Sequence, residues 1–508
     1  MPTAHATSSS VAHITSAALI GFDGARIDVE VDLKAGLPGV QIVGMGNKAI
    51  DEARQRVRSA ITNSSLDFPA RKVTVNLAPA ELPKDGTHLD LPIALGILVA
   101  SGQLTPQEVS RTLFAGELAL DGSIRPIRGA TLLAELAQRH ALKRIVIPTQ
   151  NAPQARLATT LEIIEATSLQ QLFKGLKGLE PLLTTPQPTP PQPKITPHPP
   201  LEAVIGHAQA KRALLIAAAG RHNILLSGPP GAGKTLLAKS LPGLLPPLTK
   251  QESLEVTKLQ SLATGDDGRI YTQPPLRAPH HTVTLPAFIG GGLRPRPGDI
   301  SLAHKGVLFL DELPEYPRAT LEALRQPLED RTVTLSRLYG SITYPADILL
   351  VATMNPCPCG YLGDSTTPCT CSPSALATYS RRLSGPLLDR IDLHVSIRKL
   401  SNDAFLTTNT SQNTQQPKAL SLMLTARATQ EKRYKRSDFY NAYASLQEAK
   451  KLFGISEDAK TLLRTASKKL DLSARSYLRV LRVARTIADL EKSEALGASH
   501  VAEALQFR

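Results

Sequence analysis

The stretch Gly228-Pro229-Pro230-Gly231-Ala232-Gly233-Lys234-Thr235 decides the fold of this chain. It closely follows an apolar run at 223–226 and leads into a helix-like segment at 236–239, so the sequence predicts strand, glycine-rich loop and helix in succession. Glycines let backbone N–H groups converge on a phosphate, and the helix N-terminus adds a positive dipole end. Lys234 suits the β- and γ-phosphates and Thr235 suits Mg²⁺, so we expect these eight residues to bind ATP and not to form a chance glycine-rich turn.

Two further apolar runs end in polar side chains. Residues 306–310 predict a buried strand that ends at Asp311 and Glu312. Asp311 is suited to coordinate Mg²⁺, because this metal usually takes only one or two carboxylates from the protein. Glu312 is suited to polarise the water that attacks the γ-phosphate. The run 348–353 precedes Asn355, whose amide can orient water near the γ-phosphate. An ordinary strand cap is the alternative for Asn355, but the order of the three motifs favours the functional interpretation.

Together with segment 387–392, these strand ends resemble an AAA+ ATPase. Five segments resemble the magnesium-chelatase-like branch more closely: 277–281, 290–292, 297–304, 355–360 and 384–390. With the amino-terminal region included, nearly the whole chain is similar to the ComM/YifB family. The resemblance implies an α/β AAA+ P-loop module with a helical lid, preceded by a Lon-protease-like α+β domain. It also implies ATP-driven, hexameric DNA helicase and branch-migration activity in natural transformation, whereas motif spacing alone implies a P-loop ATPase.

The resemblance gives two arginines a predicted role. Arg390 matches the arginine that reaches a neighbour's γ-phosphate in ring ATPases, a finger that accelerates hydrolysis by about 10³–10⁵. A surface salt bridge with Asp389 or Asp392 is the alternative. Arg475 resembles the lid arginine that senses nucleotide in cis, and an ordinary helical arginine is the alternative. Three arginines follow on the same helix face and are interpreted as solvated in preference to DNA-contacting: Arg479, Arg482 and Arg485.

The only four cysteines of the chain form a C-x-C pair, nine intervening residues and a second C-x-C pair. Four thiolates can hold a tetrahedral Zn²⁺, and buried or occasionally oxidised thiols are the alternatives. Such clustering argues against a disulfide framework and fits a reducing compartment, so we expect a cytoplasmic protein. The candidate zinc ligands are Cys357, Cys359, Cys369 and Cys371.

The amino-terminal region alternates strands and helices and resembles the proteolytic domain of Lon. Segments 83–86, 116–118 and 122–127 carry this resemblance. Lon-type hydrolysis uses a serine nucleophile and a lysine base, but His88 and Thr131 occupy those positions here, so we expect a non-catalytic scaffold and disfavour a protease. The expected strands are 24–32, 72–77 and 144–148, and the expected helices are 47–61 and 91–100.

Composition shifts divide the 508 residues into four predicted segments. Nine prolines lie between 181 and 200, which is typical of a semi-extended linker. A polar stretch at 401–418 indicates a surface loop or a disordered insertion, and helical patterns follow at 440–452, 457–470 and 474–490. The predicted segments are a non-catalytic Lon-like domain at 1–180, the linker at 181–200, the AAA+ core with the cysteine cluster at 201–395 and a helical lid of the magnesium-chelatase C-terminal type at 396–508.

A formal net charge of +14 favours an acidic partner, and nucleic acid is the usual one. A soluble protein that happens to be basic is the alternative. No apolar run approaches the roughly 20 residues of a membrane span, and the first ten residues lack the pattern of a secretory signal. We therefore expect single-stranded or branched DNA as partner, self-association as a hexameric ring and no membrane. The DNA-contact candidates are Arg294, Arg296, Arg331 and Arg337, whereas His280 and His281 are interpreted as loop or core histidines.

A different class of function competes with the DNA motor. A magnesium-chelatase-type ATPase subunit would remodel a protein partner, using the same nucleotide motifs. The Lon-like domain and the net charge argue against this alternative, and stimulation of ATP hydrolysis by DNA would distinguish the two functions.

Overall fold

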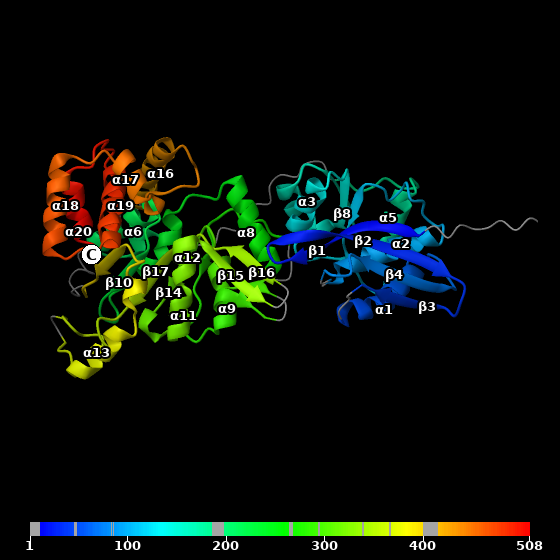
Figure 1. Ribbon diagram of the computed structural model, residues 1–508, viewed down its shortest axis with the longest axis horizontal. Coiled ribbons are helices and arrows are strands. Elements are labelled where there is room, and N and C mark those ends of the chain that lie inside the picture. The colour runs from blue at the N-terminus through cyan, green and yellow to red at the C-terminus, as the bar shows by residue number, and fades with distance from the viewer. Residues whose placement is uncertain are drawn as a thin grey trace, which may run out of the picture.

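The computed structural model describes residues 11–44, 48–82, 84, 86–184, 198–263, 268–292, 295–337, 340–364, 367–399 and 415–508. Three regions follow one another along the longest axis in Figure 1. An amino-terminal α+β region lies at one end, an α/β region lies in the middle, and a cluster of helices lies at the other end. No helix in the described ranges has both the length and the apolar character needed to cross a membrane.

The amino-terminal region is built on a seven-stranded mixed sheet in the order β3-β4-β2-β1-β5-β8-β9. Strands β1, β2 and β4 pair antiparallel, whereas β5, β8 and β9 extend the sheet in parallel. The strands are β1 (Ala12–Ile20), β2 (Asp23–Lys34), β3 (Gly39–Val43), β4 (Lys72–Ala78), β5 (Thr112–Phe114), β8 (Arg144–Pro148) and β9 (Glu162–Ala166); β6 (Glu117–Leu118) and β7 (Ile124–Arg125) form a separate small hairpin.

Helices cover this sheet, and one of them forms the centre of its core. Every residue of α2 from Asp90 to Val99 is buried, which explains why its sequence is apolar on all sides. The helices are α1 (Lys48–Asn63), α2 (Asp90–Ala100), α3 (Ala130–Arg139), α4 (Ala152–Ala158) and α5 (Leu169–Leu176). All five elements expected from the sequence in this region match observed strands or helices, with ends that differ by one or two residues.

The central region holds a parallel five-stranded sheet in the order β11-β14-β17-β10-β18. Its strands are short and fully apolar inside, as expected of a sheet covered on both faces. The strands are β10 (Ile224–Ser227), β11 (Leu276–Arg277), β14 (Val307–Leu310), β17 (Leu349–Met354) and β18 (Leu393–Ser396). The principal helices are α6 (Ala208–Gly220), α7 (Lys234–Ser240), α8 (Lys250–Ala263), α11 (Arg318–Ala323), α12 (Arg325–Asp330), α13 (Pro373–Arg381) and α14 (Gly385–Leu388).

Small hairpins and short helices are inserted between the principal elements of the central region. They are α9 (Leu285–Ile289), α10 (Asp299–Leu302), the pair β12 (Gly290–Gly291) and β13 (Arg296–Pro297), and the hairpin of β15 (Thr332–Arg337) and β16 (Gly340–Pro345). The stretch between Lys234 and Asp311 therefore contains strand β11 and inserted elements, as the 77-residue gap in the sequence (311 − 234) suggests.

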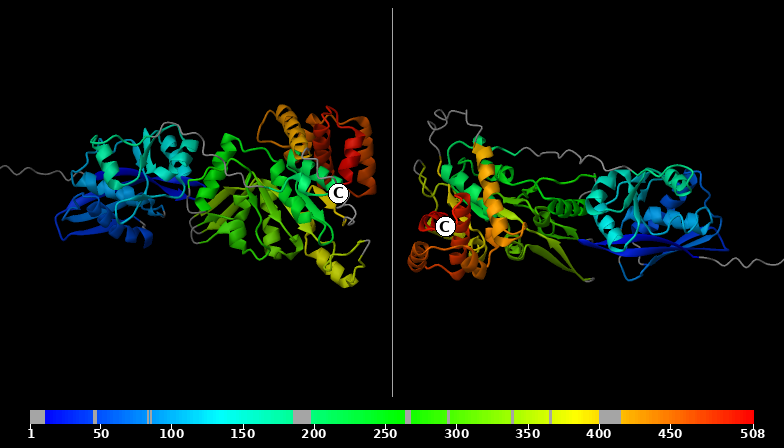
Figure 2. Two further views of the ribbon diagram at one scale, coloured as in Figure 1. Left: turned by 180° about the vertical axis from the view of Figure 1, so that it is seen from behind. Right: turned by 90° about the horizontal axis from the view of Figure 1, so that it is seen from above.

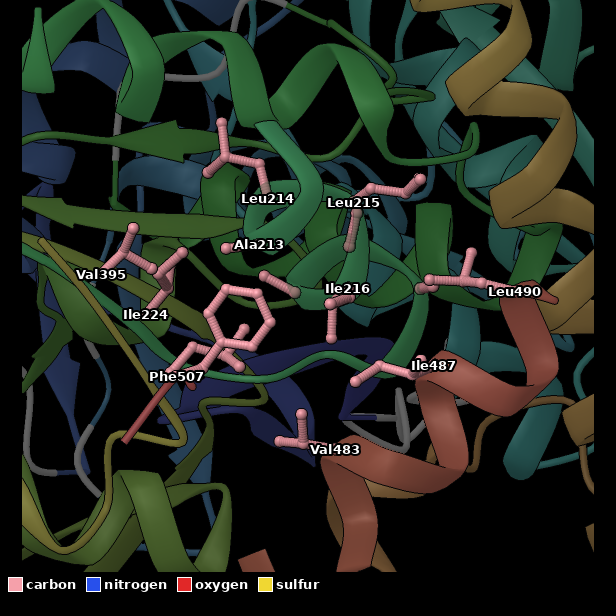
Figure 3. Packing of buried hydrophobic residues seen from close by; sticks show 14 of the residues in the cluster. Ala213, Leu214, Leu215, Ile216, Ile224, Val395, Val483, Ile487, Leu490 and Phe507 are labelled. Carbon is pink, nitrogen blue, oxygen red and sulfur yellow. The ribbon is translucent and has the colours of Figure 1, made fainter. Parts of the chain in front are cut away.

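The helical region shares a hydrophobic core with the central sheet (Figure 3). Ile487 and Leu490 of α19 pack toward α6, and Phe507 near the chain end lies beside Ile224 of β10 and Val395 of β18. The helices are α16 (Gln415–Tyr434), α17 (Leu446–Leu452), α18 (Glu457–Lys469), α19 (Ala474–Leu490) and α20 (Ala498–Leu505). The helix predicted over 440–452 is wrong at its start, because Ser445 and Glu448 form a capping box that begins a new helix after a turn at Asn441–Tyr443.

The amino-terminal region contacts the central region through the tip of the β1–β2 hairpin. Phe22 packs into the cluster that includes Leu262 of α8 and Ile342 of β16. Lys258 of α8 lies with its ammonium 4.2 Å from the centre of the Phe22 ring and forms an ion pair with Glu135 of α3 at 2.6 Å. Most of the predicted linker, residues 185–197, lies outside the described residues.

A buried ionic cluster fastens the helical region to the central one. Asp347, which precedes β17, pairs with Lys305 at 2.9 Å, and its carbonyl oxygen accepts a hydrogen bond from Arg221 at 3.0 Å. The hydroxyl of Tyr443, from the helical region, donates to the Asp347 carboxylate at 2.5 Å. Burial alone would raise the pKa of Asp347, but attraction from Arg221 and Lys305 outweighs burial and holds the pKa well below its usual range.

We expect Asp347→Asn to lower stability by about 3–5 kcal/mol, because Arg221 and Lys305 would lose their buried countercharge. A carboxyl with a lowered pKa stabilises the fold fully above its ordinary pKa, so this contribution should begin to decline as the pH falls below about 4 and be lost as the pH passes through the lowered pKa. The midpoint of urea unfolding measures both effects. The exposed control Asp330→Asn should change stability by less than about 0.5 kcal/mol, and an equal effect of both substitutions would contradict the role of the cluster.

Candidate nucleotide site and cysteine cluster

The predicted phosphate loop connects the end of β10 to the start of α7. Gly231 and Gly233 have φ values of +76° and +79°, and no atom lies within 4 Å of a Cβ built on either residue. The loop therefore needs glycine at both positions for its backbone conformation, and space remains above it for a ligand. Gly228 N–H donates to the carbonyl of Met354 at 3.2 Å, which ties the loop to the end of β17.

Lys234 lies at the centre of this site. Its ammonium donates to the carbonyls of Gly228 and Pro229 at 2.6 and 2.8 Å and to the side-chain oxygen of Asn355 at 3.0 Å. Burial lowers the pKa of Lys234, whereas the nearby carboxylates of Asp311 and Glu312 act in the opposite direction. The ammonium is thus held by neutral oxygens in the position where a phosphate would bind, and Asn355 is already in contact with it.

The candidate magnesium ligands face each other across the loop. Thr235 donates its hydroxyl to Asp311 at 3.1 Å, and Thr353 of β17 donates to the other oxygen of the same carboxylate. A hydroxyl beside a carboxylate oxygen is the oxygen-only donor set that Mg²⁺ prefers. Thr353 also accepts from the backbone N–H of Glu312 at 3.0 Å, so one threonine positions both acidic residues. Sequence reasoning missed Thr353, although it lies two residues before Asn355.

Glu312 begins a 3-10 turn in the left-handed region, with φ +52°, and its side chain is exposed. A positive φ is strained in a residue other than glycine and persists only where the surrounding structure holds it in place. Here this backbone conformation turns the chain sharply just after β14. The structure therefore brings together the loop, Thr235, Asp311, Glu312 and Asn355 at one edge of the parallel sheet.

The two arginines with predicted roles lie together, away from that loop. Arg390 and Arg475 both form ion pairs with Glu329 at the end of α12, the second at 2.9 Å. Arg390 also donates to the carbonyl of Pro386 at 2.7 Å, whereas Asp389 pairs with Arg479 and Asp392 accepts a hydrogen bond from the backbone N–H of Asn223 at 3.2 Å. No hydrogen bond joins Arg390 or Arg475 to the phosphate loop within the described part of the chain. Glu329 carried no recognisable signal in the sequence.

The interpretation of the next three arginines as a solvated face is wrong. Arg479 donates to the carbonyls of Leu388 and Ile391, and Arg482 donates to the carbonyl of Ala444 at 2.7 Å. Arg485 is only 1% exposed and pairs with Asp489 one turn later. These side chains bind carbonyls of other segments because helix α19 is covered on this face too, which its own periodicity does not reveal.

The four cysteines lie close together, although 357 and 371 are fourteen positions apart. The Sγ atom of Cys357 is 3.3 Å from that of Cys359 and 3.7 Å from that of Cys369, and all four Sγ atoms lie within 4.8 Å of one another. Backbone hydrogen bonds, first from Tyr361, lower the pKa of the Cys359 thiol to about 6, whereas burial and the neighbouring thiols outweigh a backbone hydrogen bond from Cys359 and raise the pKa of the Cys371 thiol to about 12. The cluster could therefore hold a metal ion.

The remaining candidates separate into exposed and bound side chains. Arg296 on β13 is exposed, and the guanidinium of Arg331 stacks 4.0 Å from the ring centre of Tyr443, which removes Arg331 as a free contact for DNA. His280 is exposed on a loop, and His281 beside it is partly buried. Arg294 and the side chain of Arg337 lie outside the described residues.

The Lon-like region has no hydrolytic dyad at the matching positions. His88 is buried and donates to the carbonyl of Ala17 at 2.8 Å, and the Thr131 hydroxyl is buried without a hydrogen-bond partner. At these two positions, therefore, neither residue offers a nucleophile to solvent.

Comparisons with known proteins agree with this architecture. Three family profiles match the chain. Residues 200–405 match the profile described as "Magnesium chelatase, subunit ChlI", and residues 29–151 match "Subunit ChlI of Mg-chelatase". Residues 418–508 match "Magnesium chelatase, subunit ChlI C-terminal". The chain is 42% identical over 503 residues to "Uncharacterized protein YifB" of Salmonella typhimurium, covering 98% of this chain and 97% of the relative. It is 41% identical over 503 residues to "Competence protein ComM" of Haemophilus influenzae, with the same coverage. A Lon protease of Mycolicibacterium smegmatis is 27% identical over 146 residues, 27% of this chain and 18% of that protein.

The parallel sheet with its phosphate loop, the helical region packed against it and the magnesium-chelatase profiles define an AAA+ module with an amino-terminal Lon-like domain. Within that class, the identity to YifB and ComM over nearly the whole chain shows that this protein belongs to the ComM/YifB family.

Two substitutions should separate nucleotide binding from hydrolysis. Lys234→Ala should abolish tight nucleotide binding, because the central positive charge of the loop is lost. Glu312→Gln should bind ATP and hydrolyse it at least about 100-fold more slowly, because general-base assistance typically contributes 10²–10⁴-fold. Binding of a fluorescent nucleotide and phosphate release measure the two steps. Turnover of Glu312→Gln at the rate of the unsubstituted protein would show that Glu312 is not the catalytic carboxylate.

Proposed function

We propose that this protein is an ATP-driven motor that acts on DNA as a hexameric ring, with helicase or branch-migration activity that aids the integration of DNA in natural transformation. The observation that carries the proposal is the convergence of Lys234, Thr235, Asp311, Glu312 and Asn355 at one sheet edge. This is the constellation needed to bind and hydrolyse ATP. Thr235 and Asp311 would hold Mg²⁺, which neutralises phosphate charge when bound.

The position of Arg390 supports a ring. Its side chain is bound to Glu329 and Pro386, and no contact ties it to its own phosphate loop in the described structure. A nucleotide site of this type needs a positive group at the γ-phosphate, and a neighbouring copy of the chain would supply one. Because Arg475 shares Glu329 with Arg390, we propose that both arginines are presented to the same neighbour, in place of the cis role expected for Arg475.

DNA as the partner rests on charge and on the family. The chain carries a net charge of +14, and one relative is named a competence protein. Arg296 is the described candidate that stays exposed on an inserted hairpin, where a phosphate could reach it. The cytoplasm is the compartment that such a role and four clustered thiols require.

A second candidate is a magnesium-chelatase-type subunit that remodels a protein partner. The three family profiles favour it, since each is described by a chelatase subunit. The nucleotide chemistry would be the same, but DNA would have no role in it.

We expect DNA to raise ATP hydrolysis several-fold, and this stimulation should fall steeply with added salt because phosphate contacts release counterions. Single-stranded and branched DNA should be compared at several ionic strengths. Arg296→Ala should reduce the stimulation and its salt dependence, whereas Arg436→Ala, which removes an exposed arginine paired with Asp438, should not. ATP hydrolysis that ignores DNA at every salt concentration would favour the chelatase-type function.

Arg390→Ala should bind ATP nearly normally and lose hydrolysis. Co-expression with Lys234→Ala chains should restore part of the activity, because the Lys234→Ala subunit offers an intact Arg390 to the intact loop of its neighbour. As the matched control, Arg390→Ala chains are co-expressed with chains that carry both substitutions. This mixture should give no rescue, because neither chain supplies an intact Arg390. No rescue in mixed rings of verified composition would show that Arg390 works within its own chain or only supports packing.

A further inference from the structure

The cysteine cluster lies against the candidate nucleotide loop. Gly360, between the two cysteine pairs, has a φ of +87°, and a Cβ built on it would lie 2.7 Å from the Cδ atom of Pro230. The backbone of the cysteine loop thus touches the phosphate loop so closely that only glycine fits between them. The cysteine loop also begins two residues after Asn355, whose side chain binds Lys234.

Two more contacts hold the segment that follows the cysteines. Helix α13 projects from the central region in Figures 1 and 2. Tyr379 on this helix is buried, and the nearby backbone of Asn355 partly offsets the rise in the pKa of its phenol that burial causes, while Arg382 pairs with Glu315 at 2.8 Å. Asn355 therefore binds Lys234 through its side chain and has its backbone near the segment that follows the cysteines.

The cysteine loop has almost nothing apolar to hold it in place. None of the hydrophobic clusters in the described structure contains a residue from 355 to 378. Leu362, in the middle of the loop, is 46% exposed. A segment without a hydrophobic core needs another source of order, and a bound metal supplies one in many small domains.

The sulfur geometry fits a tetrahedral metal. With Zn–S bonds of about 2.3 Å, a tetrahedron places its sulfurs about 3.8 Å apart. Three of the observed Sγ separations are 3.3, 3.5 and 3.7 Å. Backbone N–H groups of Leu362 and Cys359 point to the sulfurs of Cys357 and Cys371 at 3.3 and 3.4 Å, and such donors stabilise thiolate charge around a metal.

We propose that a thiophilic divalent cation of the zinc class, held by Cys357, Cys359, Cys369 and Cys371, is a structural part of the nucleotide site, so that metal and nucleotide bind cooperatively. The proposal rests on the proposed function in taking Gly228–Thr235 as the nucleotide loop. The metal fixes Gly360 against Pro230 and fixes Asn355 beside Lys234. Coupling between two sites is reciprocal, so bound nucleotide must also strengthen metal binding.

The test measures metal release and needs no hydrolysis. Freshly purified, chelator-free protein should contain about one zinc per chain by elemental analysis. A chromogenic chelator then reports zinc release with and without saturating ADP. We expect ADP to slow the release at least about 5-fold, the lower end of typical coupling between sites. Binding of a fluorescent nucleotide is measured on the same samples, before and after zinc removal, and should weaken by a similar factor.

A substitution outside both sites probes the connection. Tyr379→Phe keeps the ring and removes the hydroxyl whose pKa is influenced by the nearby Asn355 backbone, so the protein should retain its zinc while the effect of ADP on release becomes smaller. Tyr361→Phe makes the same chemical change within the cysteine loop and should leave the effect intact, because no interaction between its hydroxyl and Asn355 is present among the described residues.

The outcomes are distinct. Protein without zinc, or with disulfides in place of thiols, would overturn the metal site. Zinc release that ADP does not change, in protein that binds the fluorescent nucleotide, would overturn the coupling and leave the proposed ATPase function standing. Protein that retains zinc but binds no nucleotide would overturn both the coupling and the proposed function.

Discussion

Parallel pairing of β14, β17 and β10 is the constraint on which the candidate site depends. Parallel strands end at the same edge of a sheet, and the register places Leu310 beside Ala352 and Ser227 beside Met354. The next residues along each strand are therefore the ones that meet: Asp311 and Glu312 after β14, Asn355 after β17 and Gly228 after β10. Ligands of open parallel sheets bind beyond this edge because loops and helix N-termini converge there. Hydrogen bonds that Thr353 donates to Asp311 and that Lys234 donates to Gly228 and Asn355 then join the three strand ends into one polar surface.

Local patterns in the sequence were enough for this part of the molecule. The loop glycines, the apolar strands and the order of the motifs are all short-range signals, and the predicted strands and helices of the amino-terminal region match the structure for the same reason. The cysteines were also identified by their clustering, since their spacing is visible in a stretch of fifteen residues.

Contacts between distant segments could not be predicted in this way. Glu329 lies 61 positions before Arg390 and 146 before Arg475, and nothing in its neighbourhood marks it as their shared partner. Arg485 looks like a surface residue by type and helix position, yet it ends inside the protein because the turn after α19 folds back and offers its carbonyls to the guanidinium. Residues of this kind are determined by packing, and a single sequence records packing only indirectly.

The contact at Gly21 gives the amino-terminal domain a mechanical meaning. Ile342 of β16 fills the space above Gly21 so completely that a Cβ there would lie 2.3 Å from its side chain. Phe22 and Leu262 close the same apolar seam, and the Lys258–Glu135 pair crosses it. A load on the β15–β16 hairpin therefore passes into the seven-stranded sheet, and a chain cut between the two regions would leave this seam facing water. The close packing at Gly21 and Phe22 thus makes the amino-terminal domain a mechanical support for the central hairpin.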